Sequence, residues 1–211
     1  MKKIILATIA TLAFYSPIAQ AAVLHESAVL GTTGHDTGFS LDFGNYLASR
    51  FSLTNAAQVT HVGGHIGNFL GEALFAAIVA LDPETGLPAF LPSQIEIFAL
   101  AGTSFTPERL STEVTIALDV QLPPGDYGLV FGAGKFGSPT TSAGFFPCIG
   151  SCGTSSPDSW VDTDLPDASY FHGGAPFEDG GFNNTRFFVL GDSVTAPETL
   201  FIAGPLKDDG G

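Results

Sequence analysis

The stretch STEVTIALDVQLPPGDYGLVFG, which runs from Ser111 to Gly132, decides the fold. Apolar side chains occupy every second residue of its first half, and a period of two is that of a β-strand with one buried face. Pro123-Pro124-Gly125-Asp126 then forms a turn signal before a second apolar run. The stretch therefore predicts two strands joined by a tight turn as an antiparallel hairpin. The predicted inward residues are Val114, Ile116, Leu118, Val120, Leu122, Tyr127, Leu129 and Phe131.

Short apolar or aromatic segments bounded by Gly, Pro, Asn or Asp recur elsewhere and are typical of strands. They are residues 47–55, 59–67, 94–100, 168–174 and 185–192. Residues 72–82 are apolar on both faces, which favours a central strand and leaves a short helix as the alternative. Residues 137–184 are predicted to be long loops around one strand. Many short strands with Gly/Pro-rich turns predict an all-β fold, a single antiparallel β-sandwich of jelly-roll-like form over residues 22–192.

The two ends of the chain are expected to lie outside this domain. Residues 1–21 combine Lys2 and Lys3, an apolar core and the small-x-small site Ala19-Gln20-Ala21, which together predict a secretory signal peptide. The apolar run falls short of the roughly 20 residues that span a bilayer, so no membrane span is expected after cleavage. Residues 193–211 are punctuated by Pro and Gly, and we expect them to be a mobile tail.

The charge of the chain excludes some partners. Cleavage of the predicted leader would remove two lysines and leave five basic and 21 acidic residues. The formal charge would then be about −16. Such a surface repels nucleic acid and anionic lipid and suits a secreted, extracellular protein. Hydrophobic residues make up 45% of the chain and Phe occurs 19 times, so the acidity is not a sign of disorder.

Cys148 and Cys152 are the two cysteines of the chain. An exported protein meets an oxidising compartment, so their proximity in sequence predicts a local disulfide bond. A zinc site needs about four ligands, and no second Cys/His pair lies nearby at suitable spacing.

The glycine-rich run Gly132–Gly137 superficially suggests a nucleotide-binding loop. A P-loop requires G-x-x-x-x-G-K-[ST], but here Phe136 follows Gly134-Lys135 and Leu129 stands where the first glycine belongs. The run is interpreted as a turn that follows a strand.

His61 and His65 raise the question of a metal site. On a straight strand they are separated by about 13 Å, too far for one ion to bind both rings. A bulge at Gly63-Gly64 would shorten that gap. The favoured interpretation is two outward polar residues.

One segment combines acidic and aromatic side chains in a way that suits ligand binding. Its carboxylates could supply oxygen ligands for calcium, a possible cofactor, but a solvated acidic loop with turn-forming aspartates is the favoured interpretation. Its aromatic residues could stack on a sugar ring, but a packed loop anchor is again the favoured interpretation. The carboxylates are Asp158, Asp162, Asp164 and Asp167, and the aromatic set is Trp160, Tyr170 and His172.

The sequence favours no catalytic apparatus. No G-x-S-x-G elbow is present, and that motif belongs on an α/β sheet. The two carboxylates of a glycosidase must lie close together in the fold but need not be close in the sequence. A glycan-active enzyme is therefore a third functional class to consider. The candidate carboxylates are Glu72, Glu96, Glu113 and Asp119.

Five pieces of sequence, in their order, resemble secreted bacterial β-sandwich proteins that often carry a PEP-CTERM sorting signal. The pieces are ASRFSLTNAAQVTHVGGHIG, LFAAIVAL, LPPGDYGLVFGAG, LPDASYFHGG and GGFNNTRFFVLGD, within residues 25–192. The resemblance implies export and association with the cell surface or an exopolysaccharide matrix, and it brings no established catalytic residues. The sorting signal is degenerate here, because Pro197-Glu198 is followed by neither an apolar helix nor an arginine cluster. Free secretion is therefore expected.

Together these observations predict an exported, non-catalytic extracellular protein that acts as a structural or adhesive module. The expected partners are extracellular polysaccharide or cell-surface components. The alternative is a carbohydrate-binding module assisted by calcium.

Overall fold

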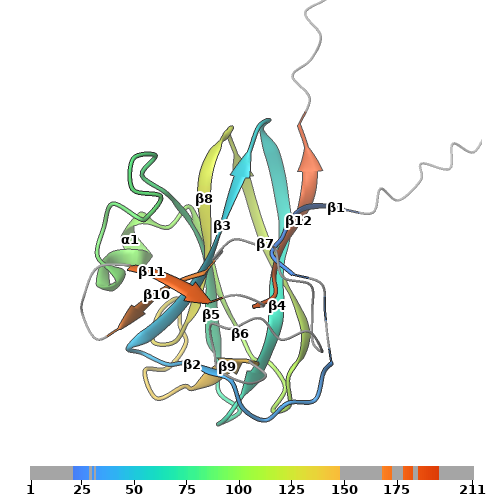
Figure 1. Ribbon diagram of the computed structural model, residues 1–211, viewed down its shortest axis with the longest axis vertical. Coiled ribbons are helices and arrows are strands. Elements are labelled where there is room, and N and C mark those ends of the chain that lie inside the picture. Colours follow the sequence, from blue (N-terminus) through green and yellow to red (C-terminus); the bar gives the residue numbers. More distant parts are fainter. Residues whose placement is uncertain are drawn as a thin grey trace, which may run out of the picture.

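The computed structural model describes residues 21–28, 30, 32–147, 168–172, 178–182 and 185–194. The fold is all-β, as predicted, and consists of two antiparallel sheets that lie face to face (Figure 1). The first sheet contains β1 (Ala22–Glu26), β2 (Phe39–Leu41), β4 (Ala57–Asn68), β7 (Thr112–Leu122), β9 (Gly144–Phe146) and β12 (Phe187–Ser193). The second sheet contains β3 (Asn45–Leu53), β5 (Leu74–Ala80), β6 (Ala101–Phe105), β8 (Gly125–Gly132), β10 (Ala168–His172) and β11 (Glu178–Phe182).

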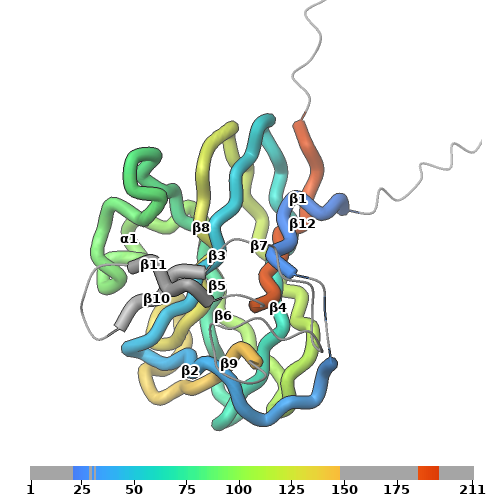
Figure 2. Tube along the Cα trace, viewed as in Figure 1, coloured from blue at the N-terminus to red at the C-terminus, as the bar shows by residue number. Residues whose placement is uncertain are grey.

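Eight of these strands follow the order of a jelly roll. The first sheet has the order β1-β12-β4-β7, and the second has the order β3-β8-β5-β6. Along these eight strands the first pairs with the last, the second with the second-last, and so on inward. The pairs are β1 with β12, β3 with β8, β4 with β7, and β5 with β6. Figure 2 shows the outermost pair, β1 in blue beside β12 in red. The jelly-roll-like sandwich predicted from the sequence is confirmed.

The core lies between the sheets and contains the side chains that the period-two pattern selected. Ile116, Leu118 and Leu122 of β7 are buried there and Val120 packs against them, while Ala117, Asp119 and Gln121 are exposed. Phe146 of β9 and Phe187 of β12 stack at 4.6 Å between ring centroids, so phenylalanine rings fill the centre.

Strands β5 and β8 are buried on both faces. Leu74, Ala76 and Ile78 of β5 face the core between the sheets. The alternate residues Phe75, Ala77 and Val79 belong to a second apolar cluster on the other face of the sheet. That outer face is covered by the segment 81–100, which is why residues 73–81 carry apolar side chains at every position. The prediction of a central strand is confirmed, and the helix alternative is wrong.

The prediction that β7 and β8 form a hairpin is wrong, although both strands exist. β7 pairs with β4 in the first sheet, and β8 pairs with β3 and β5 in the second. Pro123 and Pro124 lack the backbone N–H groups that would extend a ladder between the two strands. Instead the Tyr127 hydroxyl donates a hydrogen bond to the Pro123 carbonyl at 2.7 Å. The turn thus carries the chain from one sheet to the other.

Residues 94–100 are not a strand, contrary to the prediction. The 3-10 helix η1 (Pro92–Gln94) leads into the short helix α1 (Ile95–Phe98). Gln94 holds the first turn by accepting a hydrogen bond from the Leu91 N–H at 3.0 Å. Proline in the first helical turn is favourable because its missing N–H has no partner there. The apolar run was too short to distinguish this turn from a strand.

The predicted loop region 137–184 contains more strands than expected. β9 and, within the described parts, β10 and β11 stand where a single strand was predicted. Residues 1–20 of the predicted signal peptide, residues 195–211 of the tail, and Cys148 and Cys152 lie outside the described residues.

Candidate functional site

The outer face of the first sheet carries a cluster of polar side chains built around Arg186. The backbone carbonyl of Arg186 accepts a hydrogen bond from the His65 N–H at 3.1 Å, which aligns the arginine with β4. Its guanidinium donates to Glu113 of β7 through Nε at 2.7 Å and to Glu26 of β1 through an Nη atom. One arginine therefore links the edge strands β1 and β7 across the two strands between them.

The Arg186 guanidinium also lies over an aromatic ring. It is 5.2 Å from the ring centroid of Phe188, which is a cation–π contact. Phe188 in turn lies directly on Gly63 of β4. Arg186 is only 9% exposed, whereas the carboxylates of Glu26 and Glu113 reach solvent. The arrangement leaves one excess negative charge around a buried arginine.

His65 lies beside this cluster and is completely buried. Because it pairs with the outward-facing Glu113, it lies on the outer face of the sheet, as predicted. It is nevertheless covered by the segment 32–36. The backbone N–H of His35 donates a hydrogen bond to Ser111 Oγ at 3.0 Å, and this bond holds the segment in place. The ring centroids of His35 and His65 are 6.1 Å apart. His65 thus faces outward, as predicted, but it is shielded from solvent.

Burial determines the protonation of His65. Its pKa is lowered to about 4, mainly by loss of solvent and also by the neighbouring His35 and Arg186, against the opposing effect of a backbone hydrogen bond at Ser111. The ring is therefore neutral at physiological pH. His61 does not join the pair, since its Nδ1 lies 3.1 Å from Thr60 Oγ1. The register shift of β4 against β7 lies between Val59 and His61, not at Gly63-Gly64.

A serine and a histidine meet in the core between the sheets. His25 Nε2 of β1 lies 3.0 Å from Ser49 Oγ of β3, and its ring stacks on Phe51 at 5.6 Å between centroids. The distance is that of a nucleophile and its base. Ser49 is 0% exposed, however, so a substrate cannot reach it. The pair ties β1 to the second sheet.

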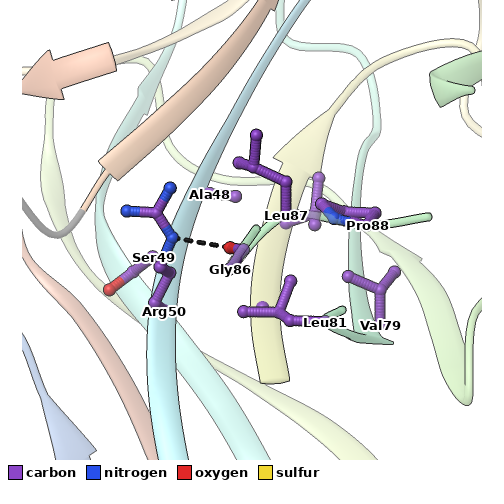
Figure 3. Close-up of a pocket in the computed structure, with 10 residues that line it drawn as sticks. Ala48, Ser49, Arg50, Val79, Leu81, Gly86, Leu87 and Pro88 are labelled. Carbon is purple, nitrogen blue, oxygen red and sulfur yellow. Dashed lines mark hydrogen bonds between the residues drawn. The ribbon is translucent and has the colours of Figure 1, made fainter. Parts of the chain in front are cut away.

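A small hollow of about 10 Å³ lies on the outer face of the second sheet (Figure 3). Residues of β3, β5 and β8 line its floor, and residues of the segment 81–88 line the rest. The Nε of Arg50 donates to the Gly86 carbonyl at 2.7 Å across it, and this bond holds the segment over the sheet. We interpret the hollow as a gap under this segment.

Exposed apolar side chains surround α1, and we call this surface the α1 ridge. Its members with their exposed fractions are Leu91 at 45%, Ile97 at 74%, Phe98 at 50% and Leu100 at 45%. The ring of Phe90 stacks on Phe98 at 5.3 Å and 22°. An open hollow beside it is lined by residues 88–91 and Gln94. Contiguous apolar surface of this kind commonly marks an interaction site.

The glycine-rich run next to the ridge is a turn, as the sequence indicated. Gly134 has a φ of +80° and Phe136 a φ of +52°, values that belong to a sharp reversal of the chain. Lys135 Nζ contacts the Ser93 carbonyl at 3.1 Å and Glu96 at 3.5 Å. The Phe136 N–H donates to Glu96 at 2.7 Å. The lysine thus pins α1 to the turn and neutralises the carboxylate of the ridge.

The four candidate catalytic carboxylates have separate local partners. Glu72 accepts from Thr141 and Ser142, and Asp119 accepts from Gln58. Glu96 and Glu113 are bound to Lys135 and Arg186, as described above. Glu113 and Asp119 are six residues apart on β7, which corresponds to about 20 Å. A glycosidase pair requires roughly 5–10 Å.

The predicted ligand-binding residues are only partly described. Tyr170 and His172 belong to β10, where their backbones pair with Leu47 and Asn45 of β3. Trp160 and the carboxylates Asp158, Asp162, Asp164 and Asp167 lie outside the described residues. Within the part of the chain that the structure describes, no three His, Cys, Asp or Glu side chains gather to hold a metal ion.

Sequence reasoning missed Arg186 and His35 as members of a cluster. The signal for Arg186 was a basic residue that directly precedes a strongly apolar strand. His35 carried no local signal, because its neighbour His65 is 30 residues away in the sequence.

Comparisons with other proteins leave the family open. No protein-family model matches the chain, and no curated protein matches it significantly. Among the described residues, no helix is long and apolar enough to cross a membrane.

Proposed function

We propose that this protein is an exported, non-catalytic adhesive module of the cell surface or exopolysaccharide matrix, and that it attaches through the α1 ridge. The observation that carries the proposal is the exposure of Leu91, Ile97, Phe98 and Leu100 around one short helix. Burying these side chains against a partner would contribute favourable free energy at about 25 cal/mol per Å² of apolar surface.

The chemistry of the ridge favours an uncharged polysaccharide as the partner. The stacked rings of Phe90 and Phe98 offer an apolar platform for the C–H face of a sugar. The ion pair between Lys135 and Glu96 leaves the adjoining surface without net charge. A formal charge of −14 on the whole chain opposes binding to anionic polymers.

Co-sedimentation with an insoluble uncharged polysaccharide tests this function. We expect the full secreted chain to sediment with the polymer and to leave the polymer's length distribution unchanged. Phe98→Ser should weaken binding at least tenfold. Phe43→Ser is the matched control, because Phe43 is 52% exposed, close to the 50% of Phe98, and lies in another loop. Shortened polymer, or equal binding by both variants, would contradict the proposal.

A second candidate is the predicted sugar-binding site at Trp160, Tyr170 and His172, with calcium held by the nearby aspartates. It is favoured by the register of β10, which places Tyr170 and His172 two residues apart in one strand of the second sheet. Binding that is lost in Trp160→Ala or on removal of calcium, and retained in Phe98→Ser, would select this candidate.

A further inference from the structure

Strand β7 has one long edge that no other strand of the described residues covers. Within that part of the chain, β4 is the only strand that pairs with β7. The opposite edge of such a strand presents backbone N–H and C=O groups, which form a template for a further strand. Edge strands are commonly kept apart by short length, proline or lysine, but β7 has 11 residues and contains neither proline nor lysine. This edge is therefore suited to pairing with another strand.

The side chains of β7 alternate regularly along the whole strand. Buried or half-buried residues follow exposed ones from Thr112 to Leu122. The register against β4 shifts once, between Val59 and His61, and the alternation of β7 continues through that point. A strand added to this edge would therefore meet an apolar row on the inner face and a more polar row on the outer face. The outer row consists of Glu113, Thr115, Ala117, Asp119 and Gln121.

Two features set the ends of the usable edge. The backbone of Ser111, just before β7, is already occupied, because its carbonyl accepts from the Gly34 N–H at 2.7 Å and its N–H donates to the His35 carbonyl at 2.9 Å. Just after β7, Pro123 has no N–H to donate to a further strand. The usable edge is thus β7 itself, and Ala117 is its middle residue.

Antiparallel pairing of two copies of β7 about Ala117 uses this whole edge and matches the side chains. Apolar residues lie opposite apolar residues in the middle of the inner face. On the outer face, Glu113 lies opposite Gln121 of the second copy, and Asp119 lies opposite Thr115 of the second copy. Each carboxylate then lies opposite a side chain that can donate a hydrogen bond.

The neighbouring registers that keep the two faces matched lack this complementarity. Pairing centred on Ile116 sets Glu113 of each copy opposite Asp119 of the other, and directly opposed like charges are destabilising. Pairing centred on Leu118 sets Glu113 opposite Pro123, which cannot donate a backbone hydrogen bond. The register centred on Ala117 avoids both faults.

We propose that the protein forms a dimer in which β7 pairs antiparallel with β7 of a second copy, about a two-fold axis at Ala117. The first sheets of the two copies then form one continuous sheet. Backbone hydrogen bonds supply the affinity of such strand addition, and the side-chain match fixes its register. A two-fold contact of this kind closes on itself, so it yields a dimer and not a fibre. The contact does not involve the α1 ridge and is independent of the function proposed above.

Disulfide trapping in the full secreted chain tests the register. Ala117→Cys would place two thiols at the axis, where opposed Cα atoms lie about 4.5–5.5 Å apart, within the range of a disulfide. We expect mild oxidation to convert this variant into a covalent dimer. Thr115→Cys is the matched control, because its two copies would lie about 13 Å apart along the strands and should not crosslink. A mixture of Thr115→Cys and Asp119→Cys should form a crosslinked heterodimer.

Mass spectrometry of the crosslinked peptide distinguishes these bonds from any that involve Cys148 or Cys152. No crosslink in Ala117→Cys, or equal crosslinking in Thr115→Cys, would overturn the proposal.

Light scattering after size-exclusion chromatography measures the dimer without a crosslink. We expect the unaltered protein to have twice the mass of one chain. Ala117→Lys should halve that mass, because it would place two like charges opposite each other at the axis. Ser104→Lys is the control, since Ser104 is an exposed residue of β6, the edge strand of the second sheet, and this variant should stay dimeric. A monomeric unaltered protein, or the same mass for both variants, would contradict the proposal.

Discussion

At the residue scale, a few polar side chains fix strands that the apolar pattern leaves undefined. β1 is an edge strand with an exposed Val23, and it is fastened at one point by Glu26 to Arg186 and at another by His25 to Ser49. These contacts were not predictable from the sequence, because they join residues 24 and 160 positions apart. Local periodicity identifies buried faces but does not identify long-range polar partners.

His25 makes the stability of the protein dependent on pH. Burial lowers its pKa to about 4, against a smaller opposing effect of Glu26. In the unfolded chain its pKa is near 6.5, so the unfolded state binds the proton more tightly. The contribution of neutral His25 is complete above about pH 6.5 and is lost as the pH falls toward 4.

Urea denaturation at pH 7 and pH 5 measures this effect. The free energy of unfolding should fall by about 2 kcal/mol between these pH values because of His25 alone. His25→Gln should remove that part of the pH dependence while retaining a polar side chain beside Ser49. An identical pH dependence in the two proteins would contradict the assignment.

At the element scale, the sequence predicted which residues form strands better than it predicted how strands pair. The alternation of Val114 to Leu122 correctly gave the buried face of β7. It could not identify β4 as the neighbour of β7, because a hairpin and a crossing between sheets bury the same side chains. The glycines of β4 do carry information about its neighbours, because the absence of a side chain at Gly63 leaves room for Phe188 from an adjacent strand.

Gly63→Ala tests the close approach of β12 and β7 to β4. A methyl group at this position would meet the Phe188 ring and the Val114 carbonyl. We expect the free energy of unfolding to fall by about 3 kcal/mol, as in an overpacked core. The control is Gly44→Ala, whose methyl group would lie 3.4 Å from Asp42 and should cost less than about 1 kcal/mol. Similar small losses in both variants, measured by urea denaturation, would refute this packing.

At the scale of the whole molecule, the jelly roll is a scaffold, and its function depends on the segments that connect and cover its strands. The same architecture serves many unrelated functions, so the fold does not assign one. What distinguishes this chain is the segment 81–100, which covers the second sheet and presents the α1 ridge. The sequence did not predict the ridge, because residues 94–100 were interpreted as a strand.

Mass spectrometry of the secreted protein tests the predicted processing. The mature chain should begin at Ala22. Its mass should be lower by two hydrogens than that of the reduced form, with a peptide bridged between Cys148 and Cys152. Retention of Met1, or free thiols at both cysteines, would disprove the corresponding prediction.

Hydrogen–deuterium exchange with and without an uncharged polysaccharide tests the central claim most directly, since it locates the contact in the intact protein. Binding through the α1 ridge should slow exchange in residues 90–100 and leave β7 and β12 unaffected. Protection confined to residues 158–172, or no protection at residues 90–100 when the polymer is bound, would contradict the account.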